Sequence, residues 1–257
     1  MPPPDSAVGI VALYPSLLGT YADGGNVTVL EQRLAWRGIP AEVVTVEVGE
    51  PVPATGDLYV LGGAEDGPQS LATDVLAADG ALSRAADRGA VIFAVCAGLQ
   101  ILGTSFSVSG GRQRDGLGLV DIATRRGERR AVGEILVEPT PDLGLPMLSG
   151  YENHGGVTAR GPGVEPLGRV AYGVGNGDGT EGFVRGRILG TYLHGPGLPR
   201  NPALADLVLS WVAGPLEPLD DSDAAALRDE RVEAVGRGAT SWAKRWLDRR
   251  SRVARAV

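Results

Sequence analysis

The chain has 257 residues, of which 43% are hydrophobic and 21% are charged, a composition typical of soluble globular proteins. Its formal net charge of −7 argues against a nucleic-acid surface over the whole molecule. One cysteine excludes an intramolecular disulfide, and with only two histidines it argues against a thiolate metal site. Since no basic leader and no run of about 18 apolar residues occurs, we expect a cytoplasmic protein with no signal peptide or membrane span.

The first hundred residues alternate between strand and helix signals. Short apolar runs over residues 7–15, 41–48, 56–63 and 90–96 predict buried strands. Residues 27–38 and 69–89 predict helices, the first capped by Asn26 and the second broken near Gly80, and a further helix begins at residue 97. This alternation predicts a doubly wound, largely parallel α/β sheet with helices on both faces, and ligands bind at the carboxyl ends of such strands.

The second half of the chain has a different character. From about residue 107 it shows short strands and glycine turns, and residues 201–214 predict a helix with proline in its first turn. Residues 220–233 are acidic and residues 237–255 are basic. We interpret residues 1–214 as one domain and residues 215–257 as a C-terminal helical tail.

The single cysteine lies in "AVIFAVCAGLQILG" (90–103), where an apolar strand meets a helix. A residue at such an elbow is lifted out at the carboxyl edge of the sheet, and the N–H groups that follow it can stabilise an oxyanion. Cys96 is therefore a candidate nucleophile. Because cysteine is also among the most often buried residues, core packing is an equally good reading of the position alone.

A cysteine nucleophile needs a base, and the chain offers only His154 and His194. His194 follows an apolar strand in "ILGTYLHG", and His154 lies in "SGYENHGG", which reads as a polar turn. Since strand ends meet at one edge of a doubly wound sheet, we expect His194 to be the base and His154 to be a structural residue.

Eight segments in chain order resemble the cobyric-acid-synthase-like branch of class I glutamine amidotransferases, and within it the glutaminase subunits of lipid II isoglutaminyl synthases. They are "YADGGN", "RLAWRGI", "LGGAEDGPQ", "VCAGLQILG", "GLGLVDIAT", "RRAVGEI", "GYENHGG" and "GTYLHGPGLPRNP". The resemblance implies a flavodoxin-like fold and hydrolysis of L-glutamine to glutamate and ammonia. It also implies a heterodimer with a Mur-ligase-like subunit, which would use ATP and Mg to amidate the α-carboxyl of D-glutamate in lipid II during peptidoglycan synthesis. No cofactor is expected in this chain.

The resemblance also assigns roles to residues. Cys96 would attack the glutamine carboxamide with His194 as its base, and backbone N–H groups at Gly63 and Ala97 would form the oxyanion hole. Arg130, in "RRAVGEI", would contact the substrate glutamine.

Three points stay open at this stage. Arg129 is a rival of Arg130, because both belong to the run "RRGERR", which could also be a solvated face. Gln100 matches the family motif, but could only brace the loop. The family's usual His-x-Glu reads His-Gly-Pro here, so a backbone carbonyl or a distant acid such as Glu152 would have to orient the imidazole of His194.

Other functions fit parts of the pattern. The chain could serve another cobyrate-type amidation, although it carries no G-x-x-x-x-G-K-[ST] motif for nucleotide binding. A cysteine hydrolase acting on another amide and a flavodoxin-like module without catalysis are further alternatives. In the basic tail, Trp242 and Trp246 among Lys and Arg residues could place a helix on the inner face of the plasma membrane, on a partner, or on the protein's own core.

Overall fold

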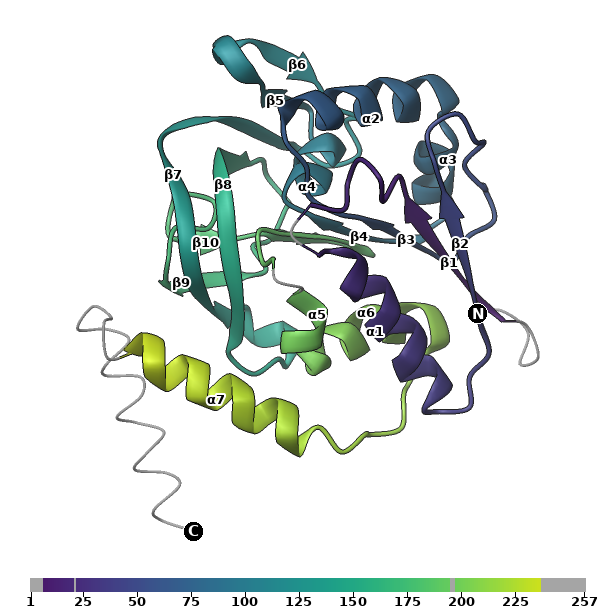
Figure 1. The fold of residues 1–257 in the computed structure, drawn as a ribbon, viewed down its shortest axis with the longest axis vertical. Coiled ribbons are helices and arrows are strands. Elements are labelled where there is room, and N and C mark those ends of the chain that lie inside the picture. Colours follow the sequence, from purple (N-terminus) through teal and green to yellow (C-terminus); the bar gives the residue numbers. More distant parts are fainter. Residues whose placement is uncertain (1–6, 21, 195–196, 237–257) are drawn as a thin grey trace.

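The computed structural model describes residues 7–20, 22–194 and 197–236. A six-stranded sheet forms the centre of the molecule, in the order β11-β12-β4-β3-β1-β2 (Figure 1). Five of its strands are parallel: β1 (Val8–Leu13), β2 (Ala41–Val46), β3 (Leu58–Leu61), β4 (Val91–Val95) and β12 (Ile188–Thr191). Only the edge strand β11 (Phe183–Arg185) runs antiparallel. β1, β3 and β4 are almost wholly buried, as their continuous apolar runs predict.

Helices cover both faces of this sheet (Figure 1). One face carries α2 (Asp66–Asp79), α3 (Ala81–Asp87) and α4 (Ala97–Leu102). The other carries α1 (Gly24–Ala35), α5 (Gly197–Arg200) and α6 (Pro202–Ala213). The predicted doubly wound α/β architecture is thus confirmed, and the carboxyl ends of β1, β3, β4 and β12 meet at one edge.

A second sheet stands beside the first, in the order β10-β9-β7-β5-β6, with β8 paired to β7. Its strands are β5 (Ser105–Ser107), β6 (Gln113–Asp115), β7 (Ile122–Pro139), β8 (Leu148–Arg160), β9 (Gly168–Tyr172) and β10 (Thr180–Glu181), with short 3₁₀ turns at Ser109–Gly111 and Pro141–Leu143. The β7–β8 ladder shifts register between Arg126 and Ala131, which leaves residues 127–130 outside the regular pairing. The short strands predicted after residue 107 are present, but β7 and β8 are longer than expected, and His154 lies in a strand rather than in a turn.

Two details of the helices differ from the sequence prediction. The first helix begins at Gly24, not after Asn26, and Asp23 stands at its N-cap. Asn26 is buried inside the helix, where its Oδ1 accepts a hydrogen bond from the Leu198 N–H at 2.9 Å. The helix expected over residues 69–89 is divided at Gly80, which adopts a left-handed conformation with φ 66°. The predicted break is confirmed.

The chain continues past α6 into α7 (Ser222–Gly236), which lies along the second sheet (Figure 1). Val232 packs in a small apolar cluster with Leu136, Met147 and Ala171.

None of the helices in the described ranges has the length and apolar run needed to cross a membrane. Trp242 and Trp246 fall outside the described residues, so the roles considered for the basic tail stay predictions, as does the domain boundary at residue 214.

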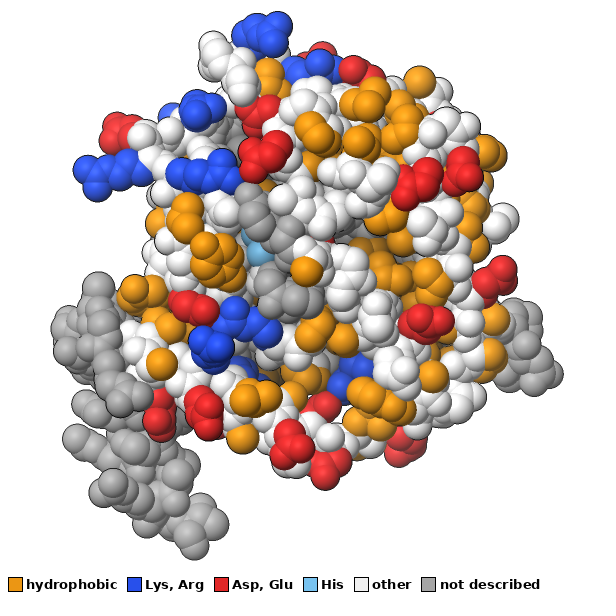
Figure 2. All heavy atoms as spheres, in the orientation of Figure 1, with side chains coloured by type: hydrophobic (Ala, Val, Ile, Leu, Met, Phe, Trp, Pro, Cys, Tyr) orange, Lys and Arg blue, Asp and Glu red, His pale blue; other side chains and the backbone are white. Residues whose placement is uncertain are grey.

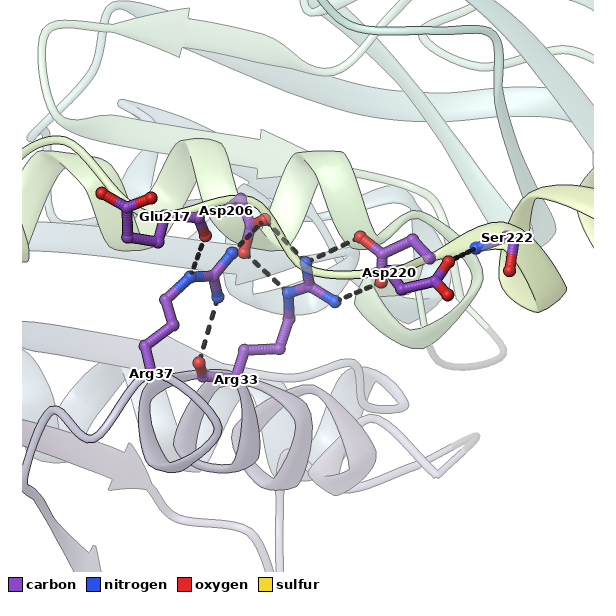
Figure 3. Close-up of polar contacts among 7 residues, drawn as sticks. Arg33, Arg37, Asp206, Glu217, Asp220 and Ser222 are labelled. Atoms are coloured by element: carbon purple, nitrogen blue, oxygen red, sulfur yellow. Dashed lines mark hydrogen bonds and ion pairs between the residues drawn. The ribbon is translucent and has the colours of Figure 1, made fainter.

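A buried arginine joins α1 to the chain that leads into α7 (Figure 3). The Arg33 side chain is 3% exposed and forms two hydrogen bonds each with Asp206 of α6 and with Asp221. Arg37, just beyond the C-terminal end of α1, donates to Asp206 and to the Glu217 carbonyl. Such paired, charge-assisted bonds fix both position and orientation. α1, whose N-cap is Asp23, is therefore held against the C-terminal segment at its other end.

We expect Arg33→Ala to destabilise the protein markedly. Removing one partner of a buried ion pair costs about 3–5 kcal/mol. Asp206 and Asp221 keep 26% and 34% exposure and can regain some hydration, so we expect a loss of about 2–3 kcal/mol. The measurement is the free energy of unfolding by chemical denaturation. Arg84→Ala is the matched control, because its side chain is 60% exposed and its pair with Asp79 spans 4.0 Å. Equal effects of the two substitutions would show that the Arg33 network adds no more than a surface pair.

Candidate active site

Cys96 occupies a sharp turn between β4 and α4. Its backbone has φ 51° and ψ −104°, a conformation that costs a non-glycine residue about 1–3 kcal/mol and persists only when its surroundings impose it. The Cys96 N–H donates to the Thr191 carbonyl on neighbouring β12 at 2.8 Å, and the Gly98 N–H donates to the Gly62 carbonyl at 3.1 Å. The lone cysteine therefore lies at a nucleophile elbow, as its sequence position predicted, although its side chain is also largely buried.

Glycines allow three backbone segments to meet at this elbow. A Cβ on Gly98 would lie 2.7 Å from the Leu61 side chain, and a Cβ on Gly62 would lie 1.9 Å from the Leu18 carbonyl oxygen. A Cβ on Gly63 would lie 2.6 Å from the His194 ring and 3.4 Å from the Cys96 Cβ. These close approaches place the ends of β3 and β4 and the loop after β1 around one point.

His194 lies just beyond β12 and is completely buried. Its backbone forms two hydrogen bonds with Tyr151 of β8, so the second sheet helps to hold it. Its Nδ1 faces the carboxylate of Asp23 at 3.1 and 3.2 Å. Cys96 lies close enough to the imidazole to help raise the pKa of His194. Since Nδ1 faces Asp23, Nε2 is the ring nitrogen that would serve the thiol, and Cys96, His194 and Asp23 are arranged in the order of a catalytic triad.

Electrostatics favour the charged form of this histidine. Burial by itself would lower the pKa of His194, but the hydrogen bond to Asp23 and the nearby Cys96 and Asp23 side chains outweigh it and raise the pKa to about 10. A protonated imidazole beside a thiol favours the thiolate, which is the nucleophilic form of cysteine. The buried cluster thus favours a positively charged imidazole beside Cys96 at neutral pH.

Asp23 was missed by the sequence analysis, and Glu152, the acid named there as an example, does not orient His194. The Glu152 carboxylate accepts the N–H groups of Val174 and Gly175 at 2.8 and 2.9 Å and lies 3.4 Å from His154, not beside His194. From sequence, "YADGGN" was only one of the eight segments that resemble the family, with no role for its aspartate. The available signal was the position of Asp23 in the loop that follows β1, because loops at the carboxyl edge of a parallel sheet supply functional side chains.

His154 has a structural environment. Its ring stacks on Tyr192 with a centroid separation of 3.8 Å, and its Nδ1 lies 3.0 Å from the Gly156 carbonyl oxygen. Glu152 lies beside its other ring nitrogen. These contacts agree with the expectation that His154 is not the base.

The structure corrects the expected oxyanion hole at Gly63. The Gly63 N–H donates to Asp23 Oδ2 at 2.8 Å, so this hydrogen already orients the carboxylate that contacts His194. Ala64 and Ala97 line the cleft beside Cys96. The Ala97 N–H stands in the first turn of α4, where no helix supplies an internal acceptor. Ala97 remains a proposed donor, and Ala64 replaces Gly63 as the candidate for the second.

Cys96 opens into a cleft of about 280 Å³ between the two sheets. Arg125, Arg126, Arg129 and Arg130 all line it, and Figure 2 shows basic and acidic side chains gathered over β7 and the β5–β6 region. Arg130 is the more firmly placed of the two candidate substrate contacts, because its Nε donates to Asn153 Oδ1 at 2.6 Å and its Nη2 lies 3.3 Å from Glu65 Oε1. Arg129 and Arg130 both line the cleft that contains Cys96, and Arg130 stays our proposed substrate contact.

Gln100 belongs to a buried chain of hydrogen bonds. Its Oε1 accepts from Gln69 Nε2 at 3.0 Å, and its Nε2 donates to the Tyr192 hydroxyl at 3.1 Å. The Tyr192 hydroxyl also contacts Thr158 Oγ1 at 2.7 Å. Both ends of the Gln100 amide are therefore used in joining α2 and α4 to the segment that carries His194. This geometry favours the bracing role considered for Gln100.

The comparisons with known proteins agree with this geometry. A family model described as a CobB/CobQ-like glutamine amidotransferase domain matches residues 9–202, well over half of the chain. The chain belongs to this family. A solved structure titled as a glutamine amidotransferase is 21% identical with a TM-score of 0.56, covering 79% of this chain and 98% of that one. The glutaminase domain of Trypanosoma brucei CTPS, with bound acivicin, is 13% identical with a TM-score of 0.52, covering 83% and 96%. These likenesses confirm the predicted fold class.

Curated relatives are more similar in sequence. The chain is 34% identical over 223 residues to the GatD subunit of the glutamine-hydrolyzing lipid II isoglutaminyl synthase of Staphylococcus aureus, with 84% of this chain and 90% of that protein covered. The corresponding Streptococcus pneumoniae subunit is 32% identical, with 77% of each chain covered. Cobyric acid synthase of Brucella canis is 36% identical over 166 residues, but only 32% of that protein is covered.

Proposed function

We propose that this protein is the glutaminase subunit of a lipid II isoglutaminyl synthase and hydrolyses L-glutamine to glutamate and ammonia. The observation that carries the proposal is the buried contact of His194 with both Cys96 and Asp23 at the carboxyl edge of an amidotransferase sheet. Two relatives named as GatD subunits of this synthase, aligned over most of the chain, support the choice of substrate and pathway. The match to cobyric acid synthase leaves most of that longer protein uncovered. It therefore gives less support to the alternative that the chain serves another cobyrate-type amidation.

The chemistry follows from the three side chains. The Cys96 thiolate attacks the carboxamide carbon of glutamine, and the carbonyl oxygen becomes an oxyanion facing the Ala64 and Ala97 N–H groups. The His194 imidazolium gives its proton to the amide nitrogen, the carbon–nitrogen bond breaks, and ammonia leaves a thioester on Cys96. Neutral His194 then takes a proton from water, whose oxygen attacks the thioester. The carbon–sulfur bond breaks, and glutamate and the ion pair are regenerated.

Free ammonia must be consumed by a second reaction if the enzyme is a synthase. We propose a heterodimer with a Mur-ligase-like subunit, which would bind ATP and Mg and activate the α-carboxyl of D-glutamate in lipid II for attack by ammonia. The glutaminase would then work in the cytoplasm, where the acceptor's stem peptide is exposed. The relatives are subunits of a synthase, which supports a partner of this kind.

Two measurements test the proposal. The full-length chain is purified with the Mur-ligase-like protein of the same cells, and glutamate and ammonia are quantified with L-glutamine as substrate. The complex is then supplied with ATP and lipid II, and amidation is followed by mass spectrometry. Glutamine-dependent amidation is the expected result. Glutamine hydrolysis without amidation would show that lipid II is not the acceptor. Absence of glutamine hydrolysis in the complex would show that the proposed glutaminase activity is wrong.

We expect Arg130→Ala to weaken glutamine use by weakening its binding. A guanidinium pairs bidentately with an α-carboxylate, and a hydrogen bond to a charged group is worth about 1.5–3 kcal/mol. Its loss corresponds to a roughly ten- to hundredfold lower kcat/KM, mostly through KM. Arg129→Ala is the matched control and should be much milder. Equal effects at both positions, or none at either, would mean that these arginines form a solvated face and that the carboxylate is bound elsewhere.

A further inference from the structure

Glu65 is an acidic residue of the cleft for which the proposed chemistry has no use. It follows the end of β3 and stands at the N-cap of α2 in an extended conformation with φ −82° and ψ 166°. Its side chain makes no capping hydrogen bond to that helix. The carboxylate is 59% exposed and lines the same cleft as Cys96. The backbone thus presents a charged group to the cleft, one residue after the proposed oxyanion donor Ala64.

Glu65 meets Arg130 across this cleft. Glu65 follows β3 of the central sheet, Arg130 lies in β7 of the second sheet, and Arg130 Nη2 lies 3.3 Å from Glu65 Oε1. Asn153 holds the other side of the guanidinium at 2.6 Å. The arginine is 48% exposed, and an ion pair exposed to this degree contributes only about 0–1 kcal/mol, so it can be exchanged for other partners at little cost.

Free glutamine carries the complementary pair of charges on a single carbon atom. Its α-carboxylate matches a guanidinium, and its α-ammonium matches a carboxylate. If the zwitterion enters with its carboxamide toward Cys96, one internal ion pair is replaced by two contacts to substrate. We propose that Glu65 binds the α-ammonium group of L-glutamine while Arg130 binds its α-carboxylate. This inference rests on the proposed glutaminase function and adds a specificity-determining residue to it.

The other acids of the cleft fit this role less well. Asp66 already accepts a hydrogen bond from the Ser109 hydroxyl. Glu128 belongs to residues 127–130, the same segment as Arg130, and it is exposed. Glu65 pairs the guanidinium from the opposite wall, next to the β3 end that adjoins the triad. Placing Glu65 there would make the enzyme select the free amino acid, because a glutamine within a peptide has no ammonium on its α-carbon.

The test compares two substrates in the complex of the full-length chain with its partner. L-glutamine has the α-ammonium, and 4-carbamoylbutanoate is the same amide without it. We expect Glu65→Gln to raise KM for glutamine about ten- to hundredfold, as the loss of one charge-assisted contact predicts, and to leave hydrolysis of 4-carbamoylbutanoate within about twofold. The wild-type preference for glutamine should therefore shrink by the same factor. Glu128→Gln is the matched control, and we expect it to retain the wild-type preference.

The possible outcomes separate this inference from the proposed function. If glutamine is hydrolysed normally by Glu65→Gln, or if both substrates suffer equally, Glu65 does not bind the ammonium and the proposed function stands. A larger effect of Glu128→Gln would move the ammonium contact to that residue and overturn the assignment. If the wild-type complex hydrolyses neither amide, the proposed function falls and this inference falls with it.

Discussion

Replacing Cys96 by serine is expected to abolish glutamine hydrolysis, with a loss of roughly 10⁴–10⁶-fold in kcat, the scale seen when a nucleophile is removed from a unit of this kind. The substitution is nearly isosteric, and it leaves the Cys96 N–H bond to Thr191 and the surrounding glycines in place. A hydroxyl, however, does not ionise beside an imidazolium as a thiol does. Steady-state release of glutamate is the measurement, and the unfolding transition should stay close to that of the wild type.

Ammonia rescue provides the control for this variant. Since only the source of ammonia is lost, a high concentration of ammonium should still support amidation of lipid II by the complex containing Cys96→Ser. His194→Ala should lose a similar amount of glutaminase activity, and the double variant should lose little more, because the two groups act as one unit. Near-full hydrolysis by Cys96→Ser would show that the chemistry assigned to the thiol is wrong.

The central sheet could be predicted from sequence because its signals are local. β1, β3 and β4 are short apolar runs that end at glycine or turn residues, and burial on both faces requires that pattern. The second sheet was predicted less well. β7 and β8 pair along most of their length, but they alternate charged, small and apolar residues around the register shift after Arg126. A strand pattern of that kind is visible only when its partner is known, which is why His154 was assigned to a turn.

The site shows the same division between local and long-range information. The elbow at Cys96 and the strand-end position of His194 are properties of single segments, and both were predicted. The role of Asp23 depends on a contact across 171 residues, and nothing in "YADGGN" itself specifies it. The use of the Gly63 N–H by Asp23 is likewise a tertiary contact, so the resemblance alone led to the wrong oxyanion donor. Family motifs identify residue types, but the partners of each polar atom follow from the fold.

Asp23→Asn is expected to lower glutaminase activity by roughly 10²–10⁴-fold. The carboxylate accepts a hydrogen bond from the Nδ1–H of His194 and its negative charge stabilises the imidazolium, and a neutral amide can do neither as well. The asparagine oxygen can still accept the Gly63 N–H, so the fold should be little affected. In a serine protease the equivalent change lowers kcat about 10⁴-fold by favouring the wrong tautomer. A thiol is more acidic than the serine hydroxyl and depends less on a strong base, which sets the lower end of the range.

The pH dependence of this variant distinguishes an effect on His194 from a general loss of structure. The wild-type pKa of His194 is raised to about 10, so protonation of the leaving amide nitrogen should persist through neutral pH and kcat/KM should fall only as the pH approaches 10. Without the Asp23 carboxylate the pKa of His194 falls, and the alkaline limb should move to lower pH.

Alkylation of Cys96, the only thiol in the chain, should also slow at pH 7, because less imidazolium is present to favour the thiolate. Glu152→Gln is the matched control, since that carboxylate lies beside His154. If the alkaline limb of kcat/KM stays near pH 10 in Asp23→Asn, or moves equally in Glu152→Gln, Asp23 does not specifically raise the pKa of His194.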